Sequence, residues 1–393
     1  MSKTLSLKQV TEGKVKILIP KPSLTNKPLV FYNPIMELNR DLTVVAAQSY
    51  IDLINCKEFL ACDAMAASGI KGIRLAVEIK NIKKKIVLND VNPSAYKIIV
   101  KNIKENKVED VCEAFNMDAN MLLSLHAKPR SRFNFIDLDP FGSPAPFLDS
   151  ALRALRNNGL IALTATDMAP LCGVHPYAAF RKYGGFPLRT EYCHEIAVRL
   201  LIGCLVFTAA KHDIIIKPVF SYAANHYVRV YALCGYGASL ASESIKKLGV
   251  IAHCFNCMNR ILIQSFFNLP VKCDLCMGKL SYAGPLWVKE IIDKSFCEKM
   301  LVKLSEKNFK LKRREEELLV KLIDETEASP TYYAIDKICD KLNIPSVKIE
   351  DIILKLREKG FSAFKTHFKG SGLKTNANIN ELKNVLKNLS SKV

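Results

Sequence analysis

The chain has 393 residues, and 49% of them are hydrophobic, which excludes a disordered protein and allows two or three domains with cores of their own. It carries 57 Lys and Arg against 38 Asp and Glu, a formal net charge of +19. This excess favours a polyanionic partner such as nucleic acid, although a lysine-rich proteome would give the same composition. The sequence shows neither an apolar run long enough to span a membrane nor a signal peptide, so we expect a cytoplasmic protein. No obligate protein partner is evident.

From about residue 58, short apolar runs alternate with amphipathic ones, which predicts a parallel sheet with helices on both faces. The strands are expected at 58–65, 84–90, 112–119, 133–139 and 158–167. The helices are expected at 71–80, 93–106, 147–158 and 190–212. Residues 214–223 and 226–237 then resemble an antiparallel pair that closes the sheet.

The C-terminal part of the chain has a different texture. Predicted helices at 312–328, 331–344 and 347–360 precede a hairpin over 361–378, and Gly360 ends the third helix. Three helices followed by a hairpin is the order of a winged helix. The predicted domains are therefore residues 1–245, a cysteine-rich segment over 246–285, and an α+β module over 286–393.

Thirteen cysteines in a chain without an export signal indicate free thiols or metal ligands. Two Cys-x₂-Cys pairs, separated by fifteen residues, have the spacing of a structural zinc ribbon with four thiolates and no open position. They are Cys254, Cys257, Cys273 and Cys276. The neighbouring His253 is expected to take no part, and the remaining cysteines are expected to be small core residues.

Three acidic residues follow predicted parallel strands. Asp90, Asp118 and Asp139 come at the ends of the second, third and fourth strands, where ligands bind in open parallel sheets. They could hold a ribose diol, an adenine amine and a substrate, whereas each one alone could simply be a helix cap or turn former. Ser68, Gly69 and Gly72 are expected to let the backbone approach the ligand. Without a phosphate-binding glycine motif, this set favours S-adenosylmethionine.

The stretch Asp139-Pro140-Phe141 is predicted to be catalytic. Its carboxylate can accept hydrogen bonds from the amino group of a nucleobase and aim that nitrogen at a methyl donor. Phe141 can stack on the base, while Pro140 fixes the backbone so that both side chains point the same way. A tight turn before the helix predicted near Ala145 is the simpler alternative.

Several motifs, spread over nearly the whole chain, resemble those of the Trm1 family of tRNA (guanine-N2)-dimethyltransferases, which act on guanine 26. They are FYNPIMELNRD (31–41), DAMAASGIKGIR (63–74), LND (88–90), DAN (118–120), DLDPFGSP (137–144) and THFKGSGLKTNA (366–377). The resemblance implies a class I, Rossmann-like methyltransferase of the α/β class, with a zinc-binding segment and a winged-helix-like domain that binds tRNA. The product would be N2,N2-dimethylguanosine.

Carried over residue by residue, the resemblance implies a site for S-adenosylmethionine and one for guanine. Cofactor contacts would come from Arg40, Asp90, Asp118, Ala119 and either Lys71 or Arg74. Related sequences often read SGIRGIR where this chain reads SGIKGIR, so Lys71 stands in place of an arginine. Phe31 and Phe141 would flank the guanine, Asn33 would line its pocket, and Asp139 would hold N2.

Basic residues in the C-terminal module, with Phe364 and Phe368 among them, are expected to grip folded RNA. They are Lys312, Arg313, Arg314, Lys365, His367, Lys369 and Lys374, although the opposed charges of KRREEE (312–317) would equally suit a solvated helix face. Two other functions stay open: methylation of another amino group, on adenine N6 or a protein glutamine, and RNA binding by a non-catalytic winged-helix protein.

Overall fold

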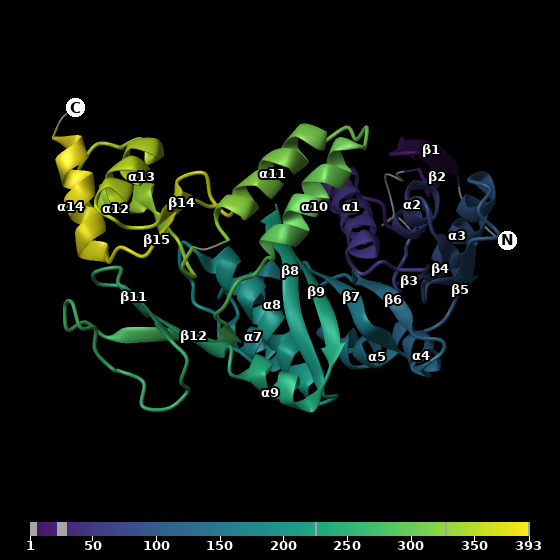
Figure 1. The fold of residues 1–393 in the computed structure, drawn as a ribbon, viewed down its shortest axis with the longest axis horizontal. Helices are drawn as coiled ribbons and strands as arrows, with labels where there is room; N and C mark the ends of the chain where they lie inside the picture. The colour runs from purple at the N-terminus through teal and green to yellow at the C-terminus, as the bar shows by residue number, and fades with distance from the viewer. Residues whose placement is uncertain (1–5, 22–29, 225, 327, 392–393) are drawn as a thin grey trace.

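The protein is described by a computed structural model that covers residues 6–21, 30–224, 226–326 and 328–391. Its centre is a seven-stranded sheet in the order β5-β4-β3-β6-β7-β9-β8 (Figure 1). β3 to β7 run parallel, and β9 is antiparallel to both of its neighbours. This confirms the predicted α/β sheet and its closing pair. The strands are β3 (Glu58–Asp63), β4 (Lys83–Asn89), β5 (Cys112–Phe115), β6 (Phe133–Leu138), β7 (Leu155–Ala165), β8 (Ile214–Ala224) and β9 (Tyr227–Tyr236).

Helices cover this sheet, and an N-terminal hairpin of β1 (Leu7–Glu12) and β2 (Val15–Pro20) packs on α2 and α3. The helices are α1 (Glu37–Leu53), α2 (Ile70–Glu78), α3 (Pro93–Glu105), α4 (Ala119–Leu125), α5 (Leu148–Ala154), α6 (Met168–Leu171), α7 (Pro176–Tyr183), α8 (Cys193–Ala210) and α9 (Ala238–Ile245), with 3-10 turns at Pro34–Met36 and Ala145–Phe147. Among the described helices, only α8 is long and apolar enough to cross a membrane, and 72% of it is buried inside the protein as a core helix.

Local chemistry explains most of the element boundaries. α3 begins where the Asn92 side chain accepts the Ser94 N–H at 2.9 Å and Pro93 supplies the first helical residue. The helix predicted over 147–158 instead ends at Ala154, because Leu155 already pairs with Phe133 as part of β7. Asn158 then takes a left-handed conformation (φ 60°) at an irregularity in that pairing, which the sequence pattern did not reveal.

The remaining elements form a cysteine-bearing sheet and a C-terminal helical part. The sheet has the order β11-β10-β12, and a second small sheet has the order β13-β15-β14. The strands are β10 (Leu248–Cys254), β11 (Arg260–Ile263), β12 (Leu280–Trp287), β13 (Tyr333–Ala334), β14 (Ala363–Lys365) and β15 (Gly372–Thr375). The helices are α10 (Lys294–Ser305), α11 (Lys312–Asp324), α12 (Ile335–Leu342), α13 (Ile349–Glu358) and α14 (Ile379–Ser390), the last of which was not predicted.

The two largest hydrophobic cores among the described residues divide the chain near residue 330. Leu319 and Leu322 of α11 belong to the core of the large sheet, and α10 packs against α1. The smaller core draws on α12, α13, α14 and the β13-β15-β14 sheet. The expected boundary at residue 286 therefore does not coincide with the division between the cores, because the apolar faces of α10 and α11 are buried against the first one.

Buried charges join the two parts across this division. Lys374 of β15 extends its ammonium to Glu195 of α8 at 3.1 Å and to Glu325, after α11, at 3.5 Å. All three side chains are at most 3% exposed, and His367 pairs with Glu325 beside them. Burial raises the pKa of Glu325, but Lys374 and His367 outweigh it and lower that pKa to about 2. We call Glu195, Glu325, His367 and Lys374 the charged seam.

The expected RNA grip is corrected by this arrangement. Lys374 and His367 cannot reach an RNA backbone because both side chains are buried in the charged seam. Lys365 and Lys369 stay near the surface, paired with Glu350 and Asp336, and Phe368 stacks on Tyr332. Arg313 is 93% exposed and pairs with Glu317 at 3.2 Å, one turn along α11, so a contact with RNA and a solvated helix face both stay open for it.

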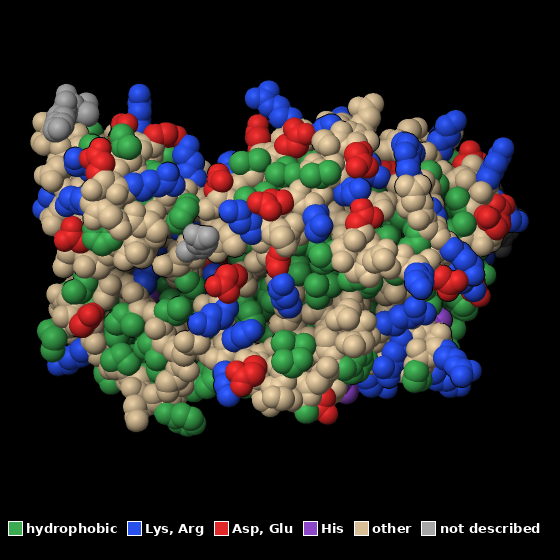
Figure 2. Space-filling model, viewed as in Figure 1, with side chains coloured by type: hydrophobic (Ala, Val, Ile, Leu, Met, Phe, Trp, Pro, Cys, Tyr) green, Lys and Arg blue, Asp and Glu red, His purple; other side chains and the backbone are tan. Residues whose placement is uncertain are grey.

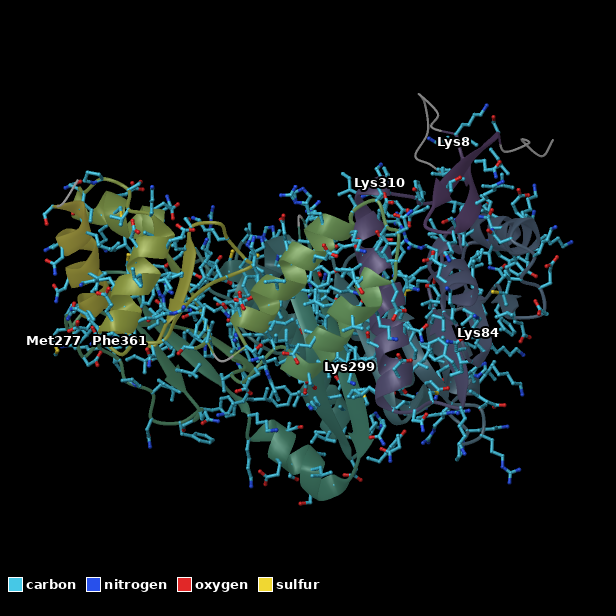
Figure 3. The ribbon with its side chains drawn as sticks, turned by 45° about the horizontal axis from the view of Figure 1, so that its top comes forward. Lys8, Lys84, Met277, Lys299, Lys310 and Phe361 are labelled. Atoms are coloured by element: carbon cyan, nitrogen blue, oxygen red, sulfur yellow. The ribbon has the colours of Figure 1, made fainter. Side chains whose placement is uncertain are left out.

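Lys and Arg side chains are scattered over the face of the molecule that Figure 2 shows, with Asp and Glu between them. Met277 of the cysteine-bearing part and Phe361 of the C-terminal part lie at one end of the molecule, far from Lys8 and Lys84 (Figure 3). The molecule is thus elongated, with the large sheet toward one end and the cysteine-bearing sheet and the C-terminal helices at the other (Figure 1).

Removal of the seam cation should be costly. We expect Lys374→Met to lower the free energy of unfolding by about 3 kcal/mol, because buried carboxylates lose a partner. Lys365→Met is the matched control, since its ion pair with Glu350 joins side chains that are 45% and 62% exposed, and solvent screens such a pair. Urea unfolding measures both. Equal losses in the two variants would contradict a structural role for the charged seam.

Candidate functional site

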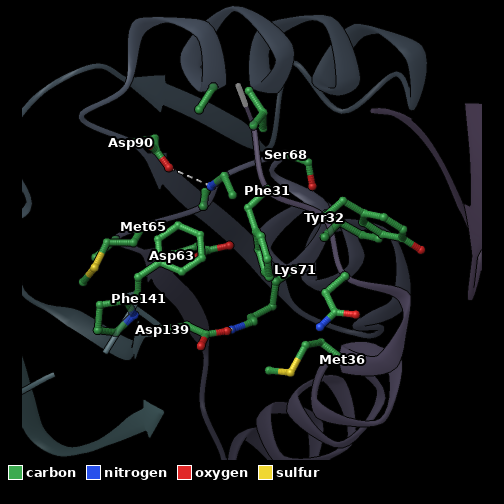
Figure 4. A pocket seen from close by; sticks show the side chains of 18 of the residues that line it. Phe31, Tyr32, Met36, Asp63, Met65, Ser68, Lys71, Asp90, Asp139 and Phe141 are labelled. Atoms are coloured by element: carbon green, nitrogen blue, oxygen red, sulfur yellow. Dashed lines mark hydrogen bonds and ion pairs between the residues drawn. The ribbon is translucent and has the colours of Figure 1, made fainter. Parts of the chain in front are cut away.

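A cavity of about 570 Å³ opens beyond the carboxyl ends of β3, β4 and β6 (Figure 4). Its walls are the segment that leads into α1, the turns after these strands, the start of α4, and residues after β7 and β8. This is where ligands bind in open parallel sheets. Of the predicted cofactor, substrate and catalytic residues, all but Arg74 line it: Phe31, Asn33, Arg40, Lys71, Asp90, Asp118, Ala119, Asp139, Pro140 and Phe141.

Asp139 stands at the end of β6 and is tied to a buried ammonium. The Nζ atom of Lys71 lies 2.6 Å from its Oδ2 and 3.0 Å from Oδ1 of Asp137. Arg229 of β9 also pairs with Asp137, and its Nη1 donates to Thr164 Oγ1 at 2.6 Å. Lys71, Asp137 and Arg229 are almost wholly buried, whereas 22% of the Asp139 side chain remains exposed at the cavity. The carboxylate is therefore fixed in place with one side open.

This arrangement keeps Asp139 ionised. Burial by itself would raise its pKa, but Lys71 and Arg229 outweigh burial and hold the pKa of Asp139 below its usual value. Burial would lower the pKa of Lys71, and Arg229 adds to this effect. The carboxylates of Asp137 and Asp139 outweigh both and raise the pKa of Lys71. Asp139 is therefore a hydrogen-bond acceptor at neutral pH and a weak base.

Two aromatic rings stand at the mouth of the cavity. The centroids of Phe31 and Phe141 lie 4.8 Å apart with an interplanar angle of 81°, an edge-to-face contact (Figure 4). Phe141 is 78% exposed and Phe31 is 41% exposed, which is unusual for side chains of this size. A planar ring that enters between them must separate the two, so each offers a face to stack on only after it moves. Asn33 lies nearby, but its side chain accepts the Ile35 N–H at 3.0 Å and so caps the turn.

The strand-end carboxylates Asp90 and Asp118 keep acceptor capacity toward the cavity. Asp90 accepts the Ala67 N–H at 2.8 Å and the Asn92 N–H at 2.9 Å, which leaves further lone pairs on both oxygens (Figure 4). Asp118 caps α4 by accepting the Met121 N–H at 3.1 Å, and its residue is exposed. Asp90 thus forms a turn and Asp118 caps a helix, and both also line the cavity.

The glycines of the first turn serve packing, contrary to expectation. A Cβ atom on Gly72 would lie 2.8 Å from Leu88 Cδ2, and one on Gly69 would lie 3.2 Å from the same atom. Gly69 also has φ +80°, which favours glycine. Their small size lets α2 approach β4, whereas close approach to the ligand falls to Ala66, Ala67 and Ser68, which line the cavity.

Arg74 is excluded from the cavity, and Lys71 is occupied. Arg74 is fully buried and pairs with Glu12, Asp41 and Glu78 at 2.9, 2.5 and 2.7 Å. It therefore supports α2 from behind. Lys71 does line the cavity, but its ammonium is shared between Asp137 and Asp139. The surroundings of Arg74 and Lys71 therefore do not favour the expected contact of either cation with the cofactor.

Arg40 keeps a donor for a ligand. Its guanidinium donates from Nε and Nη2 to Glu12, and from Nη1 and Nη2 to the Asn33 carbonyl. These contacts account for four of the five N–H groups of an arginine, and Arg40 is one of the residues that line the cavity.

Asp63 is a cavity residue that the motif analysis missed. It ends β3, is 2% exposed and accepts the Gly72 N–H at 3.2 Å. Burial raises its pKa, Lys71 opposes this, and Asp137 and Asp139 add to it, which places the pKa of Asp63 at about 7. Its position at the end of the first strand was the signal available in the sequence.

The four paired cysteines come together between β10 and β12. The Sγ atoms of Cys254, Cys257, Cys273 and Cys276 all lie within 4.8 Å of one another. The closest are Cys254 and Cys276, at 3.4 Å. In each Cys-x₂-Cys turn the residue after the second cysteine, Met258 or Met277, has a positive φ, so the two turns repeat one geometry. His253 instead contacts Tyr192 Oη through Nδ1 at 3.1 Å and is no ligand here.

Comparison with known proteins identifies the family. A family model described as "TRM: N2,N2-dimethylguanosine tRNA methyltransferase" matches residues 11–387. The chain belongs to this family. It is 38% identical to the tRNA (guanine(26)-N(2))-dimethyltransferase of Methanosphaera stadtmanae, over 96% of each chain. It is 39% identical to the protein of that name from Methanococcus maripaludis, over 96% of this chain and 97% of the other.

A solved structure of a family member supports the fold over the whole chain. The structure of Trm1 from Pyrococcus horikoshii with S-adenosyl-L-methionine is 36% identical, has a TM-score of 0.84, and covers 97% of this chain and 100% of that one. The methyltransferase fold of the Trm1 family, inferred from the motifs, is therefore confirmed for this chain.

The pKa of Asp63 gives a pH-dependent prediction. Because the folded state holds this proton up to about pH 7 while the unfolded chain releases it near 4, stability falls as pH rises between these values. The wild type should therefore lose up to roughly 4 kcal/mol relative to Asp63→Asn between pH 4 and 8. Denaturant unfolding at several pH values measures the difference. Parallel curves for the two proteins would show that Asp63 ionises normally.

Proposed function

We propose that this chain transfers methyl groups from S-adenosylmethionine to N2 of guanine 26 in tRNA, to give N2,N2-dimethylguanosine. The observation that carries the proposal is an ionised carboxylate, Asp139, held with one side open in a cavity whose mouth bears two exposed aromatic rings. The family to which the chain belongs supports the same reaction.

The cavity residues suit the proposed cofactor. Asp90 has lone pairs left for a ribose diol, and Asp118 and Ala119 lie at the next strand end, in position for an adenine. The remaining N–H of Arg40 would meet the carboxylate of the amino acid part. The carboxylates of Asp90, Asp118 and Asp139 line the cavity, and such a lining favours a sulfonium cation. When bound, S-adenosylmethionine supplies an electrophilic methyl group.

Asp139 would act on the nucleophile. The lone pair of a guanine amino group is delocalised into the ring, so the nitrogen is a poor nucleophile. A carboxylate that accepts its N–H increases electron density on the nitrogen and fixes its direction. Phe31 and Phe141 would stack on a guanine that has left the tRNA helix and so offset part of the unstacking cost. For the second methyl, the remaining N–H must turn toward Asp139.

Two further parts of the chain support the proposal. We propose that Cys254, Cys257, Cys273 and Cys276 hold one structural zinc ion, since four thiolates at these distances match its tetrahedral preference. We also propose that the β13-β15-β14 sheet with α12 to α14 is a winged-helix-like module that contacts tRNA in the cytoplasm. The family assignment disfavours adenine or glutamine as the methyl acceptor, and it disfavours a non-catalytic protein.

The direct test uses labelled S-adenosylmethionine and an unmodified tRNA transcript, followed by nucleoside analysis. We expect label in N2,N2-dimethylguanosine with the wild type. Asp139→Asn should lower the rate by at least about 10²-fold, because an amide cannot replace the anionic acceptor, while tRNA binding persists. Label in another nucleoside or in protein, or full activity of the variant, would overturn the assignment.

Substitutions of Lys71 distinguish a role in positioning Asp139 from a role in binding the cofactor. Lys71→Met should raise the pKa of Asp139, so that activity falls as pH decreases through a range in which the wild type is unaffected. Lys71→Arg should keep most activity, since a guanidinium can also span two carboxylates. The KM for S-adenosylmethionine should change little in either variant. A large rise in this KM with an unchanged pH profile would return Lys71 to the cofactor.

A further inference from the structure

A second group of metal-binding side chains lies outside the cysteine-bearing sheet. Cys172 follows α6, while Cys193 and His194 are the first two residues of α8. Their two Sγ atoms and one imidazole nitrogen all lie within 4.8 Å of one another, and Cys193 Sγ is 3.9 Å from His194 Nδ1. Among the residues that the structure describes, only this group and the four-cysteine cluster place three or more such side chains so close together.

The backbone holds the two contributing turns against each other. Gly173, directly after Cys172, has φ +89°, and a Cβ atom there would lie 2.7 Å from the backbone nitrogen of Arg189. The turn after α6 is thus pressed against the segment that leads into α8. The Cys193 N–H closes that segment with a bond to the Thr190 carbonyl at 3.3 Å. Cys172 and Cys193, distant in sequence, meet because glycine allows this approach.

The three donor atoms fit one class of ion. Two thiolates and an imidazole suit zinc, whose distances of about 2.3 Å to sulfur and about 2.0 Å to nitrogen in a tetrahedron separate its ligand atoms by roughly 3.5 to 4 Å. The observed separations require only small side-chain movements. All three residues are half-buried, so water can reach a fourth position.

We propose that Cys172, Cys193 and His194 form a second zinc site, with three protein ligands and one water. Binding displaces the protons of the two thiols to solvent and leaves the ion in its divalent state. The proposal is independent of the four-cysteine zinc and of the reaction, because it rests on these three residues alone.

The position of this site suggests what the ion does there, a role that rests on the proposed function. The segment from residue 166 to residue 193 runs from the end of β7 to the proposed ligands. At its start, the Thr166 N–H donates to the Gly142 carbonyl at 2.9 Å and the Gly142 N–H donates to Thr166 Oγ1 at 2.8 Å. Gly142 follows Phe141, so zinc would brace the segment that holds the catalytic turn.

Metal counting tests the site with the full-length chain. After removal of metal under reducing conditions and reconstitution with zinc, we expect two equivalents to survive gel filtration by elemental analysis. The double variant C172S/C193S should keep one, while Cys204→Ser, a half-buried cysteine of α8 outside the cluster, should keep two. Equal zinc content in the wild type and the double variant, or a loss of one equivalent in Cys204→Ser, would overturn the proposal.

A second measurement needs no variant and so does not depend on folding of the substituted chain. Alkylation with iodoacetamide, followed by peptide mapping, should label Cys172 and Cys193 at least about tenfold more slowly with zinc than without it, because a coordinated thiolate is a poor nucleophile. Labelling of the two cysteines at the same rate in both conditions would contradict the site. Zinc content and cysteine labelling are measured without tRNA or S-adenosylmethionine. Failure of the zinc site can therefore be distinguished from failure of the proposed methyl transfer.

Discussion

The shared ammonium of Lys71 is the interaction on which the site depends. Asp63, Asp137 and Asp139 meet at the ends of β3 and β6, and three carboxylates in a buried place repel one another strongly. Lys71 and Arg229 together supply two positive charges, and the raised pKa of Asp63 accounts for the third carboxylate by keeping its proton. Asp139 is the most exposed of the three, so it is the one whose oxygen lone pairs a ligand can reach.

Much of this could be predicted because it follows from local rules. The apolar runs of β3, β4, β6 and β7 mark a parallel sheet, and strand-end acids in such a sheet meet at one edge. The close spacing of Cys254, Cys257, Cys273 and Cys276 likewise restricts their arrangement before any fold is known. These signals lie within short stretches of sequence, so the structure places the residues together as expected.

Two of the corrected predictions, those for Arg74 and Lys374, concern partners far away in the sequence. Nothing near Arg74 shows that Glu12 and Asp41 surround it, and nothing near Lys374 shows that Glu195 lies across from it. Sequence reasoning treated both cations as available for ligands because a charged side chain is usually solvated. Long-range pairing decides otherwise, and only tertiary structure reveals it. The motif around Lys374 is thus explained by packing rather than by contact with RNA.

The charged seam has a consequence for how one nucleotide is selected. Because Glu195 belongs to a core helix beneath the large sheet and Lys374 to the small module, the two parts are joined by ion pairs that tolerate little slippage. The distance between the small module and the cavity is then fixed. If the module contacts tRNA as proposed, the base that reaches Phe31 and Phe141 is set by this fixed distance, and one position can be selected without contacts to the neighbouring bases.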